Sequence, residues 1–176
     1  MAEAQASREA TVLRIAIAAD HAGYPLKAVV VADLRAAGHE VSDLGTDDPS
    51  VPSDYPDVAE RVCEAVRAGR AERGIALCGS GVGVSVAANK FPGIRAGVCH
   101  DHYSAHQAVE HDDMNVLCIG ARVVGEALAR ELAHAFVDAR FTSEERHARR
   151  LAKVRAIEQR FLKTRGVPRS ARAGSA

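Results

Sequence analysis

The chain has 176 residues, 47% of them hydrophobic and 26% charged, and its 23 basic and 23 acidic side chains balance to a formal net charge of zero. This length fits one domain built around a single hydrophobic core. The balanced charge gives no sign of a nucleic acid or membrane-surface partner, and no apolar run approaches the ~18 residues of a membrane-spanning helix.

Apolar, β-branched runs alternate along the chain with helical patterns. The runs that predict strands are 11–19, 39–45, 73–78, 94–99 and 115–120. The helical patterns lie at 24–37, 56–69, 82–90, 103–110 and 124–138. Repeated β-α units with short connections form a parallel sheet, because each crossover returns over the sheet in the right-handed sense. The predicted fold is α/β, a Rossmann-like three-layer α/β/α sandwich with a five-stranded parallel sheet.

A further helix is predicted at 145–161, outside the sandwich. One side of it carries apolar residues at helical spacing: Leu151, Val154, Ile157 and Phe161. Arginines occupy the other side, so the segment is an amphipathic C-terminal arm that needs a surface to lie on. The domain is expected to span 11–162, between disordered ends at 1–10 and 163–176.

The cysteines, Cys63, Cys78, Cys99 and Cys118, show no CxxC spacing, which argues against a zinc site or a redox pair. The first residues lack the pattern of a signal peptide. We therefore expect reduced thiols in a cytoplasmic protein, with most of these cysteines serving as buried packing.

Polar and reactive residues follow the predicted strands, at the edge where ligands collect in open parallel sheets. They are Asp20, His21, Asp54, Tyr55, Cys78, Ser80, His100, His102 and Arg122, with His111 and Asp112 at the end of the fourth helix. His102 and His106 share a helix face, but no carboxylate-histidine pattern completes a metal site, and a solvated helix start explains them.

The stretch "LCGSGVGVSVAANK" (77–90) follows the third strand and is rich in glycine. It matches neither the P-loop nor the dinucleotide fingerprint. Two interpretations remain: a turn whose amides converge on a small anion, or a tight turn with glycines for packing. Cys78 lies directly before those amides. It is either a reactive thiol, acting as a base or a nucleophile, or a buried side chain that only packs at the strand end.

The segments "AADHAGYPLK", "SDYP", "CGSGVGVSVAANKFPGIRAGVC", "EHDDMNVLCIGARVVG" and "ERHARR" together resemble the type B ribose-5-phosphate isomerase family, over about residues 13–161. The family includes isomerases of other aldose phosphates. The resemblance implies an aldose-ketose isomerase that works through a cis-enediol intermediate without a metal or organic cofactor. The expected substrate pair is ribose 5-phosphate and ribulose 5-phosphate, of the pentose phosphate pathway.

The resemblance implies a role for each part of the glycine-rich stretch. Cys78 is the base that moves a proton between C1 and C2, and Ser80 shuttles protons between the substrate oxygens. The oxyanion hole is the loop of Gly79, Gly81, Val82 and Gly83. Asp20 and His111 are the ring-opening pair, and Tyr55 is the aromatic residue that packs against the sugar.

The resemblance also implies a shared site and a phosphate cluster. His111 comes from a neighbouring subunit, so we expect a homodimer or higher oligomer. The phosphate ligands are His21, Arg122, Arg146 and Arg150, two of them on the C-terminal arm, which would cross to the partner.

One departure from the family weakens the substrate assignment. Asp112 stands where many relatives have an asparagine that binds substrate oxygens, so it either binds a hydroxyl, is protonated or points away. Two alternatives therefore stay open: the same chemistry on erythrulose 4-phosphate or allose 6-phosphate, and a non-catalytic sugar-phosphate-binding subunit. A thiol phosphatase is disfavoured because the loop contains no arginine.

Overall fold

The structure is a computed structural model that describes residues 11–45 and 48–163. The strands are β1 (Arg14–Ala19), β2 (Glu40–Asp43), β3 (Arg73–Cys78), β4 (Ala96–Val98) and β5 (Val116–Gly120). The helices of this part of the chain are α1 (Tyr24–Ala36), α2 (Tyr55–Arg67), α3 (Val82–Ala88), α4 (His102–Asp112), α5 (Glu126–Asp138) and α6 (Glu145–Lys163). The ends predicted to be disordered lie outside the described residues, apart from Lys163, the last residue of α6.

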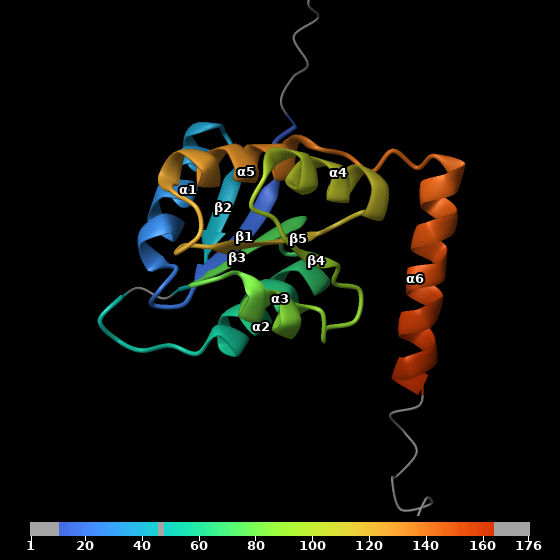
Figure 1. The fold of residues 1–176 in the computed structure, drawn as a ribbon, viewed down its shortest axis with the longest axis horizontal. Helices are drawn as coiled ribbons and strands as arrows, with labels where there is room; N and C mark the ends of the chain where they lie inside the picture. The colour runs from blue at the N-terminus through green and yellow to red at the C-terminus, as the bar shows by residue number, and fades with distance from the viewer. Residues whose placement is uncertain (1–10, 46–47, 164–176) are drawn as a thin grey trace, which may run out of the picture.

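The strands form one parallel sheet in the order β2-β1-β3-β5-β4. Helices α1, α4 and α5 cover one face of this sheet, and α2 and α3 cover the other (Figure 1). The predicted three-layer sandwich with five parallel strands is confirmed. Its central strands β3 and β5 are buried along their whole length, as expected where helices cover both faces of a sheet.

Alternate residues of β3 enter two separate apolar layers. Ile75 and Leu77 belong to the layer beneath α1, α4 and α5. Ala76 and Cys78 belong to the layer beneath α2 and α3. The period of two along a strand therefore directs the Cys78 side chain toward the α2–α3 face.

The strand β4 is shorter than the predicted run 94–99 because it lies at the edge of the sheet. Its Ala96 pairs with a side chain instead of a further strand: Asn89 Nδ2 donates to Ala96 O at 2.8 Å, and Ala96 N–H donates to Asn89 Oδ1 at 3.0 Å. The two bonds cover part of an edge that would otherwise be open to pairing.

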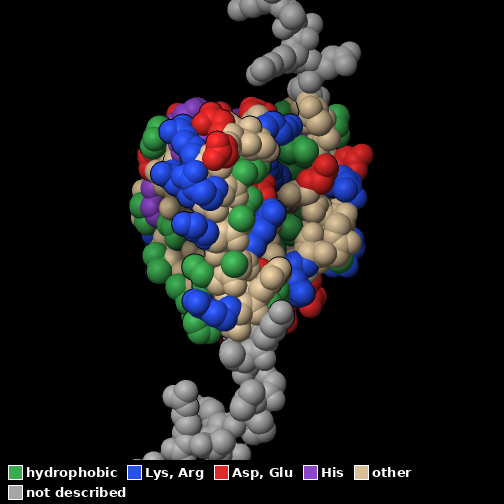
Figure 2. All heavy atoms as spheres, turned by 90° about the vertical axis from the view of Figure 1, so that its right-hand side faces the viewer, with side chains coloured by type: hydrophobic (Ala, Val, Ile, Leu, Met, Phe, Trp, Pro, Cys, Tyr) green, Lys and Arg blue, Asp and Glu red, His purple; other side chains and the backbone are tan. Residues whose placement is uncertain are grey.

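The arm α6 stands at one side of the sandwich (Figure 1). It is held to the body by Gly93 N–H, which donates to Glu158 Oε1 at 2.8 Å, and by an Arg155–Asp113 ion pair at 3.4 Å. Between α6 and the body lies an apolar groove of about 650 Å³, lined by residues that include Phe91, Ile94, Met114, Leu151, Ile157 and Phe161. Figure 2 looks onto the outer side of the arm, where Lys and Arg side chains gather. The predicted amphipathic pattern is present, and Val154, Ile157 and Phe161 remain half exposed.

A buried histidine makes the stability of this fold depend on pH. His39 is 8% exposed, its Nδ1 accepts the Leu13 N–H at 3.2 Å, and burial lowers the pKa of its imidazole. The unfolded chain then binds a proton that the folded chain does not, so the free energy of unfolding falls as pH drops through about 6.5. We expect the urea midpoint to fall between about pH 7.5 and about pH 5.5, and to fall less in His39→Asn, which keeps an acceptor but cannot titrate. An equal fall in both proteins would contradict this assignment.

Candidate active site

The carboxyl ends of β1 and β3 lie side by side at the point where the strand order reverses. The connection from β1 leads to β2 on one side, and the connection from β3 leads toward β4 on the other. Such a switch point opens a crevice beyond the strand ends, where ligands bind in open α/β sheets. Asp20 follows β1 here, and its N–H donates to Leu77 O of β3 at 3.2 Å. Asp20 and Cys78 therefore lie at the ends of neighbouring strands, an adjacency that the structure supplies.

The Asp20 carboxylate is fixed by backbone donors. It is 7% exposed, and its Oδ1 accepts the N–H groups of Ala22 and Gly23 at 3.0 and 2.9 Å. These are the residues that lead into α1. A buried carboxylate with two backbone donors keeps one orientation without needing a side-chain partner.

The thiol of Cys78 faces the turn that follows it. Cys78 is 5% exposed, and its Sγ accepts the Gly81 N–H at 3.1 Å. Ser80 is exposed, and its Oγ accepts the Val82 N–H at 3.3 Å. Gly81 has a φ of +79°, in the region that favours glycine. The turn thus places a thiol, a hydroxyl and several backbone amides within one short segment.

The other three thiols are Cys63, Cys99 and Cys118. Burial raises the pKa of Cys63 to about 12 and that of Cys99 to about 11, and it also raises the pKa of Cys118. All four cysteines are free and buried. The predicted packing role fits Cys63, Cys99 and Cys118, because a thiol held protonated by burial is a poor base.

Two larger side chains flank the glycine turn. Arg122 N–H donates to Gly79 O at 2.9 Å, and a Cβ at Gly79 would lie 3.5 Å from Arg122 Nε. On the far side, a Cβ at Gly83 would lie only 3.0 Å from Tyr55 Cδ2. The Tyr55 ring, 43% exposed, therefore rests on Gly83 and presents an aromatic surface beside the turn.

Two histidines complete this edge. His21 N–H donates to Ser53 Oγ at 3.0 Å, and Ser53 N–H donates back to His21 Nδ1 at 3.3 Å. Because Nδ1 is an acceptor, the proton of neutral His21 lies on Nε2. His100 Nε2 accepts the Gly120 N–H at 3.2 Å. The sequence placed His100 at this edge because it follows a predicted strand, and the structure adds its hydrogen bond to Gly120.

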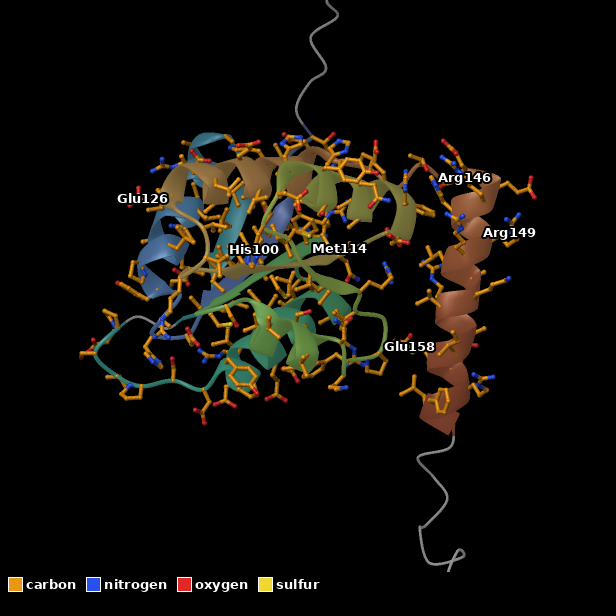
Figure 3. All side chains as sticks on the ribbon, in the orientation of Figure 1. His100, Met114, Glu126, Arg146, Arg149 and Glu158 are labelled. Carbon is orange, nitrogen blue, oxygen red and sulfur yellow. The ribbon has the colours of Figure 1, made fainter. Side chains whose placement is uncertain are left out.

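The remaining predicted site residues lie at the opposite edge of the sheet and on the arm. Helix α4 starts at the carboxyl edge and runs back, so His111 and Asp112 lie near the amino ends of the strands. There Arg95, which precedes β4, pairs with Asp113 at 2.7 Å. Figure 3 shows Arg146 on the arm, across the molecule from His100. Arg146 pairs with Glu144 at 3.0 Å, and Arg150 is exposed.

His111 has a neighbour that sequence reasoning missed. The ring of His147, on α6, lies 3.9 Å from the His111 ring between centroids, at 30°. His147 is 1% exposed, and its Nδ1 pairs with Thr142 Oγ1 at 2.8 Å. Burial and the adjacent His111 lower the pKa of His147. Its only sequence signal was its place in "ERHARR", beside Arg146.

The predicted residues thus form two groups in one chain. The first, at the carboxyl edge, is Asp20, His21, Tyr55, Cys78, Gly79, Ser80, Gly81, Val82, Gly83 and Arg122. The second, at the amino edge and on the arm, is His111, Asp112, Arg146 and Arg150. We call them the thiol group and the His111 group.

Within residues 11–45 and 48–163, no cluster of three or more His, Cys, Asp and Glu side chains is placed to hold a metal ion. His102 and His106 pair instead with surface carboxylates, Glu131 at 3.2 Å and Glu110 at 3.4 Å. No helix of the same residues has the length and apolar character needed to cross a membrane.

The fold defines a Rossmann-like α/β protein whose carboxyl edge brings together a thiol, a carboxylate and backbone amides. The Ribose/Galactose Isomerase family model matches residues 15–154, and the chain belongs to this family. It is therefore an isomerase, as the sequence predicted.

Relatives with assigned names support this membership. The chain is 47% identical over 147 residues to ribose-5-phosphate isomerase B of Escherichia coli (strain K12), covering 84% of this chain and 97% of that protein. It is 43% identical over 129 residues to D-erythrulose-4-phosphate isomerase of Pectobacterium atrosepticum, covering 73% of this chain and 85% of that protein.

Solved structures agree with the fold. Ribose-5-phosphate isomerase B of Clostridium thermocellum superposes with a TM-score of 0.81 at 44% identity, over 84% of this chain and 99% of that chain. The Mycoplasma genitalium ribose-5-phosphate isomerase B with bound ribulose-5-phosphate gives a TM-score of 0.78 at 36% identity, over 83% and 96%.

The glycine turn gives a steric prediction. A Cβ at Gly81 would be strained by the positive φ and would lie 3.0 Å from Gly120 N. We expect Gly81→Ala to lower the free energy of unfolding by about 2–3 kcal/mol and to abolish isomerase activity, because the N–H that faces Cys78 must move. Gly38 is the matched control: its φ is +93° and nothing lies within 4 Å of its Cβ position. Gly38→Ala should cost only about 1 kcal/mol and keep activity; equal losses in the two variants would refute the steric account.

Proposed function

We propose that this protein interconverts ribose 5-phosphate and ribulose 5-phosphate through an enediolate, with Cys78 as the base. The observation that carries the proposal is the Cys78 thiol at the end of β3, facing the Gly81 N–H and lying one strand from the Asp20 carboxylate. The E. coli relative and the ribulose-5-phosphate-bound structure, by their names, support this substrate pair.

The first step is opening of the furanose ring. The anomeric hydroxyl loses a proton, the bond from C1 to the ring oxygen breaks with its electron pair going to that oxygen, and the ring oxygen gains a proton. Asp20 and His111 are the pair that exchanges these two protons. The fixed orientation of the Asp20 carboxylate supports this role, because a proton acceptor must be held within hydrogen-bond reach.

The second step moves hydrogen between carbons. Cys78, as thiolate, takes the proton from C2 of the open aldose, and the electron pair forms the C1–C2 double bond while charge moves to O1. The amides from Gly79 to Gly83 stabilise this oxyanion. Ser80 passes the proton of the C2 hydroxyl to O1, and the proton on Cys78 is delivered to C1. The product is the ketose, and the base is regenerated.

The substrate is held at its two ends in this proposal. Tyr55 packs against the sugar from its position on Gly83. The phosphate is bound by His21, Arg122, Arg146 and Arg150, since guanidinium groups form paired hydrogen bonds with phosphate oxygens. The Arg122 side chain beside Gly79 supports its part in this set.

A complete site requires two chains, because the thiol group and the His111 group lie apart in one. We propose a homodimer or higher oligomer in which the amino edge and the arm of one chain together bring the His111 group to the partner's carboxyl edge. The half-exposed apolar residues of α6 and the groove beside them support such a contact, because exposed apolar surface of this extent marks an interaction site. The reduced, buried thiols support the cytoplasmic location expected from the sequence.

A second substrate assignment is favoured by one observation. The D-erythrulose-4-phosphate isomerase relative is nearly as similar as the ribose-5-phosphate one, and Asp112 replaces the asparagine expected from the family. The same proton transfer on a four-carbon phosphate is therefore the runner-up. Two further alternatives are allose 6-phosphate as the substrate and a sugar-phosphate-binding subunit without activity. An assay of several sugar phosphates distinguishes them.

The base can be tested directly. Cys78→Ala should keep its fold by circular dichroism but lose about 10²- to 10⁴-fold in ribose 5-phosphate turnover and in exchange of the C2 proton with solvent. Cys63→Ala, which removes a buried thiol elsewhere, should retain activity. The wild type is assayed beside four-carbon and six-carbon phosphates, with chelator present. An undiminished rate in Cys78→Ala would exclude the mechanism, preference for another sugar would change the substrate, and binding without any exchange would favour the non-catalytic subunit.

The shared site can be tested by mixing variants. His111→Asn and Cys78→Ala should each be inactive alone. When equal amounts exchange subunits, about half of the dimers are mixed and each mixed dimer has one intact site, so about a quarter of the wild-type activity should return. If both residues served a site within one chain, mixing would restore nothing.

A further inference from the structure

The His111 side chain is held by two contacts that the proposed chemistry does not itself explain. Gln107 lies one helical turn before it on α4, and the Gln107 amide nitrogen faces His111 Nδ1 in a short contact. On another side, His147 stacks against the His111 ring at 3.9 Å. Both Gln107 and His111 are partly buried.

These two contacts restrain different properties of the ring. The stack restrains the plane of the imidazole, but a ring turned by 180° would stack equally well. That turn exchanges Nδ1 with a carbon atom, which cannot accept a hydrogen bond. The Gln107 amide therefore selects one of the two flipped orientations of the His111 ring. The stack on His147 would allow both.

The Gln107 contact also determines the position of the proton. A neutral imidazole carries one proton on either nitrogen, and the tautomer follows from the bond that the other nitrogen makes. Because Nδ1 accepts from the amide, the proton of neutral His111 lies on Nε2.

We propose that Gln107 is a positioning residue that sets the tautomer and ring orientation of resting His111, so that Nε2 faces the sugar ring oxygen. The inference rests on the proposed role of His111 in ring opening. His147 supports the arrangement as an uncharged ring: its Nδ1 is bonded to Thr142, and its Nε2 has no hydrogen-bond partner among the described residues.

An amide suits a residue that gains and loses protons. Gln107 carries N–H donors and a carbonyl acceptor on one group, so a half rotation lets it accept from Nδ1–H when His111 binds a second proton. The imidazolium then gives its Nε2 proton to the ring oxygen and is left neutral, with its remaining proton on Nδ1 bonded to the Gln107 carbonyl. The charged neighbours of the histidine pair are Glu110 and Asp112 on α4 and Glu144, Arg146 and Arg150 around the start of α6. A carboxylate at position 107 could only accept a hydrogen bond from His111. It would therefore place the proton of the neutral ring on Nδ1.

The test combines nitrogen NMR with a substrate comparison. In ¹⁵N-labelled wild-type protein, the His111 nitrogens should show the Nε2–H tautomer. In Gln107→Leu the Nε2–H fraction should fall to that of a free imidazole, and Gln107→Glu should move the proton to Nδ1. Turnover of ribose 5-phosphate, which arrives as a furanose, should fall about three- to tenfold in Gln107→Leu, the loss expected for one hydrogen bond. Ribulose 5-phosphate has its C5 oxygen esterified and cannot close a furanose ring, so exchange of its C1 proton with solvent should be unchanged.

The matched control is His106→Gln, on the same helix, whose native side chain pairs with Glu110 and not with His111. It should change neither the His111 tautomer nor turnover. The proposal is overturned if the Nε2–H fraction of His111 in Gln107→Leu equals that of the wild type, or if ring-closed and open substrates lose rate equally. A wild-type protein without isomerase activity would instead remove the proposed function, and the tautomer measurement would still decide what Gln107 does to His111.

Discussion

The carboxyl edge depends on close contact between backbones. A Cβ at Gly120 would lie 2.6 Å from the carbonyl carbon of Ser80, and a Cβ at Gly23 would lie 2.8 Å from the carbonyl carbon of Leu77. The turn after β3 is thus held from both sides, by β5 and by the turn after β1. Two hydrogen bonds join the same backbone segments: Asp20 N–H donates to Leu77 O, and Ala121 N–H donates to Cys78 O. The position of the thiol is therefore set by the main chain, which is stiffer than any side-chain packing.

This backbone constraint gives the Cys78 sulfur a hydrogen bond from a turn amide. Cys63 and Cys118 lie in the same apolar layer as Cys78, and burial is the largest influence on the pKa of each of these two thiols. Cys78 is the last residue of its strand, so the chain turns there and an unpaired amide of the turn reaches its sulfur. At the end of a strand in a buried parallel sheet, the side chain lies in apolar surroundings and the turn that follows has N–H groups that are not paired in the sheet. At a position inside the strand the side chain is buried in the same way, but the backbone N–H groups are paired.

The sequence predicted the sheet and the carboxyl edge well because both follow from short-range patterns. Periodic apolar runs locate the strands, and parallel topology then brings Asp20 and Cys78 to one edge without further information. It did not predict that Tyr55 rests on Gly83, that His100 bonds Gly120, or that His147 stacks on His111. Each of these is a contact between residues far apart in sequence, and its geometry depends on how helices settle on the sheet. The predicted amphipathic arm is present, but only the structure shows that it stands beside the β4 edge with half of its apolar stripe exposed.

The separation of the thiol group from the His111 group follows from the direction of α4. Eleven helical residues rise by about 15 Å, so a helix that starts at the carboxyl edge carries His111 well away from Cys78. No side-chain rotation spans that distance, and the hydrogen-bonded connection between α5 and α6 keeps the arm on the amino side. In a two-fold dimer, any contact between the thiol group of one chain and the His111 group of the other occurs twice. One interface would then complete both sites together, so catalysis and assembly would depend on the same surface.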